Sequence, residues 1–308
     1  MTRYAIVGSG FGLYGYIPAI AGTLESLVVL PESARVKFAA RPELARFEPS
    51  IRWALSIDSA LQQASVAVIA VPPQEQAAIV CECLQHAGIG AIVLEKPVAA
   101  TPGRARGVLG SIMGAGRRCR VGYTLLQTDF AKALLASDAS TAEDPLTIEW
   151  SFMAHHFANG VDTWKRRHEQ GGGALRFFGI HLVALLALLG YREASHSTLA
   201  GANPGDPSRW LATVTGPGKA SASVVLDCRS PLKAFRIARD HNGNQKEVVD
   251  RADPFWSIPN ADETDRRVDY LSRLLGTLDD PDLLHHRHLM DTQRLWERIE
   301  AATQFENL

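Results

Sequence analysis

Short and almost continuous apolar runs alternate with helix-like stretches over residues 1–123 of the 308-residue chain. Such runs are typical of parallel strands that are buried on both faces of a sheet. The predicted strands are 4–8, 26–30, 66–72, 91–95 and 118–123, and the predicted helices are 13–24, 33–47, 74–87 and 102–115. Because strands alternate with helices, we expect an α/β fold with a doubly wound, nucleotide-binding type of domain over residues 1–123.

After residue 123 the pattern changes to the alternation of apolar and polar residues that is typical of antiparallel strands. The predicted strands are 146–154, 210–216, 220–228 and 233–240. A strongly apolar helix is expected over 174–189, and a helix with an apolar stripe over 265–303. We therefore predict a second, α+β domain over residues 124–308, with an open, mainly antiparallel sheet and a C-terminal helix that packs back near the domain interface.

Charge and cysteine content narrow the possible functions. The chain carries 32 basic and 33 acidic residues and a net charge of −1, so no overall field attracts nucleic acid or an anionic membrane. Its 4 cysteines lack the paired spacing of a zinc site, and we expect reduced thiols and no bound metal. The first residues lack a secretory signal pattern, and the apolar run 182–189 is too short to span a bilayer. We therefore expect a cytoplasmic protein that acts on a small molecule.

A glycine-rich loop, AIVGSGFGLYG, follows the first predicted strand. Gly8, Gly10 and Gly12, with Phe11 between them, stand where a tight turn lets backbone N–H groups approach a pyrophosphate at a helix N-terminus. The spacing differs from the standard fingerprint, because the third glycine is expected at the position of Leu13. We predict a dinucleotide site here; a turn of purely structural purpose is the alternative.

An acidic residue that holds the adenosine ribose is expected about 20 residues beyond such a loop. Glu32, just past the second predicted strand, is the candidate. Ser33 and Arg35 follow closely and could instead hold a 2′-phosphate. The choice between NAD and NADP is therefore open.

The fourth predicted strand ends in LEKPVAAT. In open α/β sheets, ligands bind beyond the carboxyl ends of the strands, so Glu95 and Lys96 are expected at the same edge as the glycine loop, with Pro72 from the preceding strand. A lysine there would face the nicotinamide end of a dinucleotide, and Pro97 would fix the turn that aims it. The alternative for Lys96 is a solvated loop charge.

Five motifs, in this order, resemble the glucose–fructose oxidoreductase and inositol dehydrogenase family, also called the Gfo/Idh/MocA family. They are GSGFG, VIAVPP, LEKPVAAT, VGY and GGGALRFFGIH. The resemblance implies a Rossmann domain paired with an open-sheet domain, and NAD or NADP acting on sugars, cyclitols or related alcohols and ketones. It implies that Lys96 is the active-site lysine, which assists proton transfer and contacts the nicotinamide ribose. In relatives the open sheet often forms a dimer face, so we expect a homodimer or homotetramer.

The second catalytic element departs from that family. There, a glycine pair or triplet is followed by an aspartate and, four residues later, by a histidine. Here the triplet 171–173 is present and His181 stands at the histidine position, but Phe177 stands at the aspartate position. A carboxylate beside a histidine raises the pKa of the imidazole and fixes the ring. Without it, Lys96 could still move the proton alone. We predict His181 as the second catalytic residue, which orients the substrate or assists; a core residue is the alternative.

Polar and aromatic residues are concentrated just before the glycine triplet, in HHFANGVDTWKRRHEQ. Trp164 and Lys165 are similar to a tryptophan–arginine pair that helps line the cofactor and substrate cleft in relatives. A basic, aromatic cluster suits an anionic or sugar-bearing substrate; an exposed charged loop is the alternative. The predicted substrate residues are Tyr123, His156, Arg167, Phe177 and His181.

The leading prediction is an NAD(P)-dependent oxidoreductase that acts on a hydroxyl, carbonyl or imine carbon of a small, sugar-like molecule. One alternative is a non-redox lyase, cyclase or glycoside-cleaving enzyme that retains bound dinucleotide. The other is a catalytically silent binding or scaffold protein.

Overall fold

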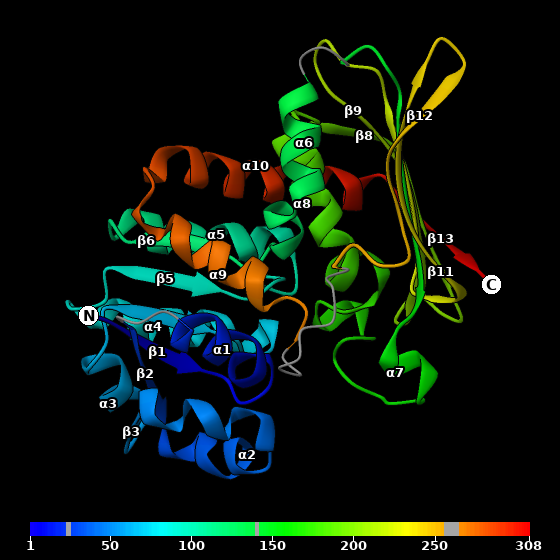
Figure 1. Ribbon diagram of the computed structural model, residues 1–308. Helices are drawn as coiled ribbons and strands as arrows, with labels where there is room; N and C mark the ends of the chain where they lie inside the picture. The colour runs from blue at the N-terminus through cyan, green and yellow to red at the C-terminus, as the bar shows by residue number, and fades with distance from the viewer. Residues whose placement is uncertain (23–25, 139–141, 256–264) are drawn as a thin grey trace. The chain divides into compact units, whose positions relative to one another are not determined.

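A computed structural model describes residues 1–22, 26–138, 142–255 and 265–308. The chain forms two compact units (Figure 1). The first contains Met1–Ala99, Gly107–Gln127 and, from the C-terminal part, 265–286. The second contains Ala100–Arg106, the described residues of 128–255, and Arg287–Leu308. Each unit has its own sheet.

The sheet of the first unit is entirely parallel. Its spatial order is β3-β2-β1-β4-β5-β6, so the order reverses between β1 and β4. In a doubly wound sheet this switch point is where ligands bind, and the predicted Rossmann fold is confirmed. The strands are β1 (Thr2–Val7), β2 (Ser26–Pro31), β3 (Ile51–Ala54), β4 (Val66–Ile69), β5 (Ala91–Leu94) and β6 (Arg118–Val121).

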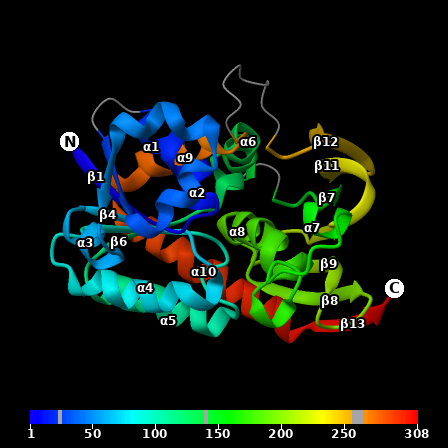
Figure 2. The same cartoon turned by 90° about the horizontal axis from the view of Figure 1, so that it is seen from below.

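Helices cover both faces of this sheet (Figure 2). On one face lie α1, α2 and α9, and on the other α4 and α5. α5 and α10 each contain residues of both units. The helical segments of this part of the chain are η1 (Gly12–Tyr16), α1 (Ile17–Ala21), η2 (Glu32–Ala34), α2 (Arg35–Ala39), η3 (Pro42–Ser50), α3 (Ile57–Gln62), α4 (Pro73–Gln85), α5 (Pro102–Gly114), η4 (Thr124–Gln127), α9 (Val268–Gly276), η8 (Thr277–Asp279) and α10 (Asp282–Ala301).

The predicted single helix over 33–47 is wrong. The α-helix α2 ends at Ala39, and a 3₁₀ segment begins at Pro42. Arg41, between them, has φ −124° and ψ 87°, because a residue that precedes proline is driven out of the helical region.

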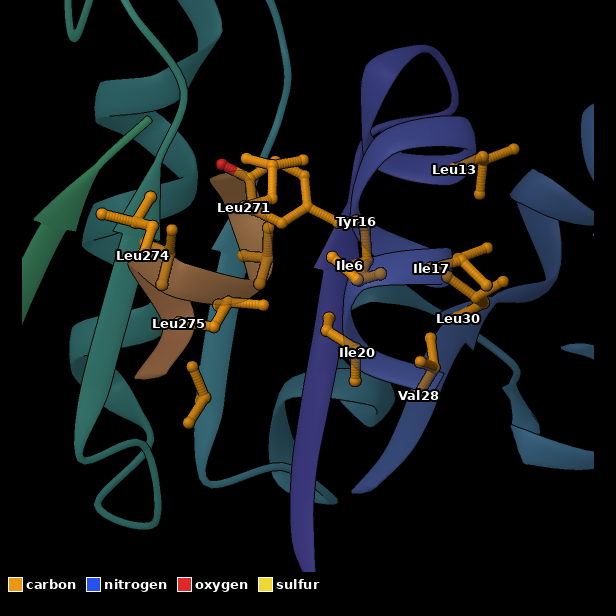
Figure 3. Packing of buried hydrophobic residues seen from close by; sticks show 14 of the residues in the cluster. Ile6, Leu13, Tyr16, Ile17, Ile20, Val28, Leu30, Leu271, Leu274 and Leu275 are labelled. Atoms are coloured by element: carbon orange, nitrogen blue, oxygen red, sulfur yellow. The ribbon is translucent and has the colours of Figure 1, made fainter. Parts of the chain in front are cut away.

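The C-terminal part of the chain completes the core of the first unit. Leu271, Leu274 and Leu275 of α9, at the i, i+3, i+4 spacing of an amphipathic helix, join the cluster formed by β-strand residues such as Ile6 and by helix residues such as Tyr16 (Figure 3). Burial of a leucine contributes about 1.5–3 kcal/mol, so α9 is a substantial part of this core.

Arg120 of β6 ties the segment after α9 to the sheet. This guanidinium is 2% exposed. It donates to the carbonyl oxygens of Thr277 (2.6 Å) and Asp280 (3.1 Å), and to the carboxylate of Asp282 (2.9 Å).

The second unit is built on a seven-stranded sheet of order β12-β11-β7-β10-β9-β8-β13. β10 runs parallel to β7, and β13 parallel to β8, while the other neighbouring pairs are antiparallel. The predicted open, mainly antiparallel sheet is therefore confirmed. Its strands are β7 (Leu146–Met153), β8 (Glu193–Gly201), β9 (Pro207–Thr215), β10 (Ala222–Asp227), β11 (Arg229–His241), β12 (Asn244–Arg251) and β13 (Thr303–Asn307).

The helical segments of the second unit are α6 (Asp129–Ser137), α7 (His155–Ala158), η6 (His168–Gln170), η7 (Ala174–Gly179) and α8 (Ile180–Leu188). The segment η7 packs on the sheet so closely that a Cβ on Gly179 would lie 2.8 Å from the ring of Trp210. Among the described residues, only His168–Leu188 is long and apolar enough to cross a membrane by length and composition, and 83% of its apolar 18-residue window is buried. That burial is typical of a core helix.

Candidate dinucleotide site and active-site residues

The three glycines of the first loop have three different roles. Gly8 has φ +134°, and a Cβ there would overlap the backbone of Ala70, so only glycine fits this turn. Gly10 has nothing within 4 Å of its Cβ position, which leaves the backbone open to a ligand. A Cβ on Gly12 would lie 3.0 Å from Ile6, so Gly12 lets the helix pack on β1. The standard fingerprint assigns these roles to its three glycines, and the loop fits a dinucleotide pyrophosphate.

The early third glycine has a local explanation. The helix begins as a π-helical turn, Gly12–Tyr16, and Gly12 is already in contact with β1. Leu13, where the fingerprint expects glycine, is fully buried in the core instead. The Phe11 ring folds back over its own turn and lies beside Gly15. A Cβ on Gly15 would lie only 2.8 Å from Phe11 Cζ, so glycine leaves room for the ring.

The two ribose-reading candidates after β2 are bound to each other. Arg35 Nε donates to Glu32 Oε1 at 2.5 Å and Nη2 donates to Oε2 at 3.1 Å. The Arg35 guanidinium also lies over the Trp53 ring, 4.2 Å from its centroid. Both side chains are exposed. The carboxylate and the guanidinium that the sequence predicts as alternative readers of the ribose are thus hydrogen-bonded to each other at the end of β2.

Lys96 follows β5, at the same edge of the sheet as the glycine loop. Its side chain is 9% exposed, unlike that of an ordinary solvated loop lysine. The Lys96–Pro97 peptide bond is cis. Gln76 of α4, fully buried, donates from Nε2 to the Pro97 carbonyl oxygen at 2.8 Å, and this bond fixes the turn.

Glu95, which precedes Lys96, is half-buried and is held by Tyr16. The Tyr16 hydroxyl donates to Glu95 Oε1 at 2.7 Å, and the Lys96 backbone N–H donates to Oε2 at 3.3 Å. Burial raises the pKa of Glu95, although the charge of Lys96 and the Tyr16 hydrogen bond act in the opposite direction. Burial and the neighbouring carboxylate raise the pKa of Tyr16. No local sequence pattern indicates this pair, because its members are 79 residues apart.

Gly122, in the VGY motif after β6, is explained by this pair. A Cβ at this position would overlap Glu95 Oε1 and lie 3.2 Å from the Tyr16 hydroxyl oxygen. Tyr123, 2% exposed, follows directly. Pro72, after β4, precedes the first residue of α4. All five predicted features of the first unit (the glycine loop, Glu32, Pro72, Glu95–Lys96 and Tyr123) thus follow the carboxyl ends of parallel strands in one sheet.

We predict that Gly122→Ala lowers the free energy of unfolding by about 1–3 kcal/mol, because an inserted methyl group must displace the half-buried Glu95 and the buried Tyr16, which are hydrogen-bonded to each other. Urea unfolding measures this change. Gly110→Ala is the matched control, because Gly110 is an exposed residue of α5 with nothing within 4 Å of its Cβ position. That change should leave stability unaltered or raise it. Equal effects of the two substitutions would contradict the role given to Gly122.

In the second unit, Phe177 belongs to an aromatic cluster. Its ring packs against Trp164 (centroid distance 5.3 Å) and Phe178 (4.7 Å), and Lys165 Nζ lies 5.5 Å from its centroid. The turn that carries Phe177 is fixed by its neighbour Arg176, which donates from Nε and Nη2 to Glu300 of α10 at 2.7 and 2.8 Å.

His181 lies in α8 and is 4% exposed. The rings of His181 and Phe255 pack edge to face, with their centroids 5.8 Å apart. The other residues of the helix are apolar, as the sequence indicated. The structure therefore places His181 in an apolar environment.

His156 and Arg167, both predicted substrate residues, have different environments. His156 is 6% exposed and stacks on Phe178, with ring centroids 5.7 Å apart. Burial, with the charges of Lys165 and Arg166, lowers the pKa of His156 to about 4. Arg167 is exposed and donates to Asp162, with Nε 2.9 Å from Oδ1; both border a polar cleft of about 470 Å³.

We predict that His156 makes the second unit acid-sensitive. The pKa of His156 falls from 6.5 to about 4 on folding, so the unfolded chain binds the proton more readily. The free energy of unfolding should therefore fall as the pH is lowered from 6.5 to 4, by at most about 3 kcal/mol for this residue. His168, whose pKa burial also lowers to about 4, adds to the same trend.

Urea unfolding over this pH range measures the effect. His156→Phe keeps an aromatic ring on Phe178 and should flatten the pH dependence, whereas replacement of the exposed neighbour His155 with glutamine should not. An unchanged slope in His156→Phe would show that His156 titrates normally.

Comparison with known proteins agrees with this geometry. Residues 2–123 match the model of an oxidoreductase family with an NAD-binding Rossmann fold. No curated protein matches the chain in sequence.

Solved structures share the fold over almost the whole chain. The WlbA dehydrogenase from Bordetella pertussis, in complex with NADH and UDP-GlcNAcA, has a TM-score of 0.75 at 17% identity, covering 97% of this chain and 96% of that one. A myo-inositol dehydrogenase from Corynebacterium glutamicum has a TM-score of 0.72 at 15% identity, covering 99% of this chain and 97% of that one. A 3-ketoreductase from Actinomadura kijaniata, in complex with NADP and TDP-benzene, has a TM-score of 0.71 at 11% identity, covering 100% of this chain and 99% of that one.

The matched Rossmann domain and the glycine loop at the switch point of its sheet define an NAD(P)-dependent oxidoreductase, with NAD or NADP as cofactor. Residues 2–123 match the model of the Gfo/Idh/MocA oxidoreductase family, the family that the motifs of the chain resemble.

Proposed function

We propose that the protein transfers hydride between NAD(P) and a hydroxyl, carbonyl or imine carbon of a small, sugar-like substrate, with Lys96 as the proton donor or acceptor. The observation that carries this proposal is the buried position of Lys96 at the carboxyl end of β5, beside Glu95. A partly desolvated lysine held by a fixed turn is suited to proton transfer. The bound nicotinamide supplies or accepts the hydride.

The residues that we propose for the cofactor are divided by role. Gly8, Gly10, Phe11 and Gly12 hold the pyrophosphate, and either Glu32 or Arg35 reads the adenosine ribose. Pro72, Glu95 and Lys96 lie toward the nicotinamide, because β4 and β5 follow β1 in the sheet order. Trp164 and Lys165 of the second unit are proposed as further cofactor contacts.

The proposed substrate residues are Tyr123, His156, Arg167, Phe177 and His181. Phe177 presents a ring where relatives have a carboxylate, and a sugar can place its apolar C–H face on such a ring. Since His156 is neutral above about pH 4, it would contribute a hydrogen bond and no charge. The solved relatives with UDP-GlcNAcA or with TDP-benzene support a sugar-like or nucleotide-linked substrate.

Three further proposals come from the sequence. Residues 1–123 act as the cofactor-binding domain and 124–308 as the substrate-binding domain. The chain forms a homodimer or homotetramer through the open sheet. The cytoplasmic location stays a prediction.

A non-redox reaction with retained dinucleotide is the second candidate, and Phe177 favours it. Because Phe177 stands where the resemblance implies an aspartate, the aspartate–histidine pair that the resemblance implies for the redox reaction is incomplete. The two candidates differ in whether the nicotinamide is consumed.

The test has two stages. First, NADH and NADPH are titrated into protein freed of bound nucleotide, following tryptophan quenching; binding of neither would remove both candidates and favour a silent scaffold. Second, keto-sugars and nucleotide-linked keto-sugars are supplied with the preferred cofactor, and nicotinamide absorbance and products are measured together. Stoichiometric loss of NAD(P)H supports hydride transfer, whereas product without loss of NAD(P)H supports the non-redox candidate.

A further inference from the structure

Arg267, from the C-terminal part of the chain, lies against the glycine loop. Its Cζ is 4.1 Å from the centroid of the Phe11 ring, and Phe11 stands between Gly10 and Gly12. The ring also lies close to Gly15 of its own turn. The contact joins residues 256 positions apart in sequence, and no motif indicated it.

The Arg267 side chain is held in one orientation. Its Nε and Nη2 donate to the two carboxylate oxygens of Asp265 at 2.9 and 2.8 Å, and its backbone N–H donates to Oδ1 at 2.9 Å. A bidentate pair of this kind fixes the plane of the guanidinium, and the Phe11 ring supports that plane. Little side-chain entropy is left to lose when a ligand binds.

One edge of this guanidinium is still available. Within the described residues, Nη1 donates to no protein group, and the side chain is 31% exposed. A planar guanidinium with one edge occupied by Asp265 can offer the other edge to an anion. The loop that it faces is the one that fits a pyrophosphate, and Gly10 leaves that loop open.

We propose that Arg267 binds the diphosphate of the dinucleotide through Nη1, with Phe11 as the platform and Asp265 as the positioning residue. This inference rests on the dinucleotide site described above. The cofactor site would then be completed by the segment that begins α9, and not by the β1 loop alone.

Arg267→Met tests the proposal, since methionine retains packing on Phe11 but has no charge. Loss of a charge-assisted hydrogen bond should weaken NADH or NADPH binding about 10- to 100-fold. The cofactor affinity of Arg267→Lys should fall between that of Arg267→Met and that of the unsubstituted protein, because lysine keeps the charge but loses the planar fork. Arg266→Met is the matched control, because Arg266 is the exposed adjacent residue, and its substitution should leave affinity unchanged.

Competition with ADP and with adenosine separates contact from mere support of the loop. If Arg267 binds the diphosphate, the Arg267→Met substitution strongly weakens the binding of ADP and leaves the binding of adenosine unchanged. If Arg267 only supports the loop, the substitution weakens the binding of both ADP and adenosine, and that result would overturn the proposal. So would unchanged NADH affinity in a folded Arg267→Met or Arg267→Lys variant, which would leave the proposed function intact. Absence of NADH and NADPH binding by the unsubstituted protein would overturn the inference and the proposed function together.

Discussion

Replacing Lys96 with methionine is expected to lower substrate turnover by about 10²- to 10⁴-fold, the usual contribution of a positioned proton donor or acceptor. Methionine is of similar length, so it fills the buried space at the end of β5 without the ammonium. The affinity for NADH or NADPH should change much less, because the residues that we propose for the pyrophosphate and the adenosine ribose follow β1 and β2. Steady-state kinetics with separate cofactor titrations would measure both quantities.

The controls separate proton transfer from charge. Lys96→Arg keeps a cation but releases no proton near neutral pH, so it should be almost as impaired as Lys96→Met. Lys37→Met, at an exposed lysine of α2 in the same unit, should be fully active. Parental turnover in Lys96→Met would contradict the proton-transfer role and move the reaction to another group.

The second large effect concerns the Glu32–Arg35 pair. Removing Glu32 frees the Arg35 guanidinium and removes a carboxylate that repels a 2′-phosphate, so Glu32→Ala should shift preference toward NADPH. Removing Arg35 should shift it toward NADH. Because each hydrogen bond to a charged group contributes about 1.5–3 kcal/mol, the ratio of the two dissociation constants should move about 10- to 100-fold in opposite directions.

Titration of both variants with both cofactors measures this ratio. The exposed Arg236–Asp250 pair on the β11–β12 hairpin, with Nε and Oδ1 3.2 Å apart, provides the control, because its removal should not alter the preference. Movement of the ratio in the same direction in both variants would exclude these residues as the ribose readers.

The parallel strands of the first unit could be predicted because burial on both faces leaves continuous apolar runs. β3, with the sequence IRWA, was missed because it is an edge strand that alternates polar and apolar residues over only 4 positions. β12, NQKEVVDR, was missed for a related reason: most of its residues are exposed, and it pairs with β11 alone. Pairing with a neighbouring strand, which the chain's local pattern does not encode, gives these segments their structure.

The candidate site was predictable where its residues directly follow strands. The glycine loop and Lys96 are in this class, because the carboxyl ends of parallel strands share an edge. Tyr16 and Arg267 were not predictable, because each acts through a partner that is distant in sequence. Their contacts follow from helix packing on the sheet, and a single sequence contains no periodicity that reports such pairs.

The position of α9 also determines when the first unit can finish folding during synthesis. The strands of its sheet are complete once residue 121 has been made, but the helix that covers Ile6 and its neighbours begins at Val268. At about 5–20 residues per second, this interval is roughly 7 to 30 seconds. During that time part of an apolar face of the sheet is without its cover, so we expect the nascent chain to engage chaperones then, and the first unit to become protease-resistant only after α9 has been made.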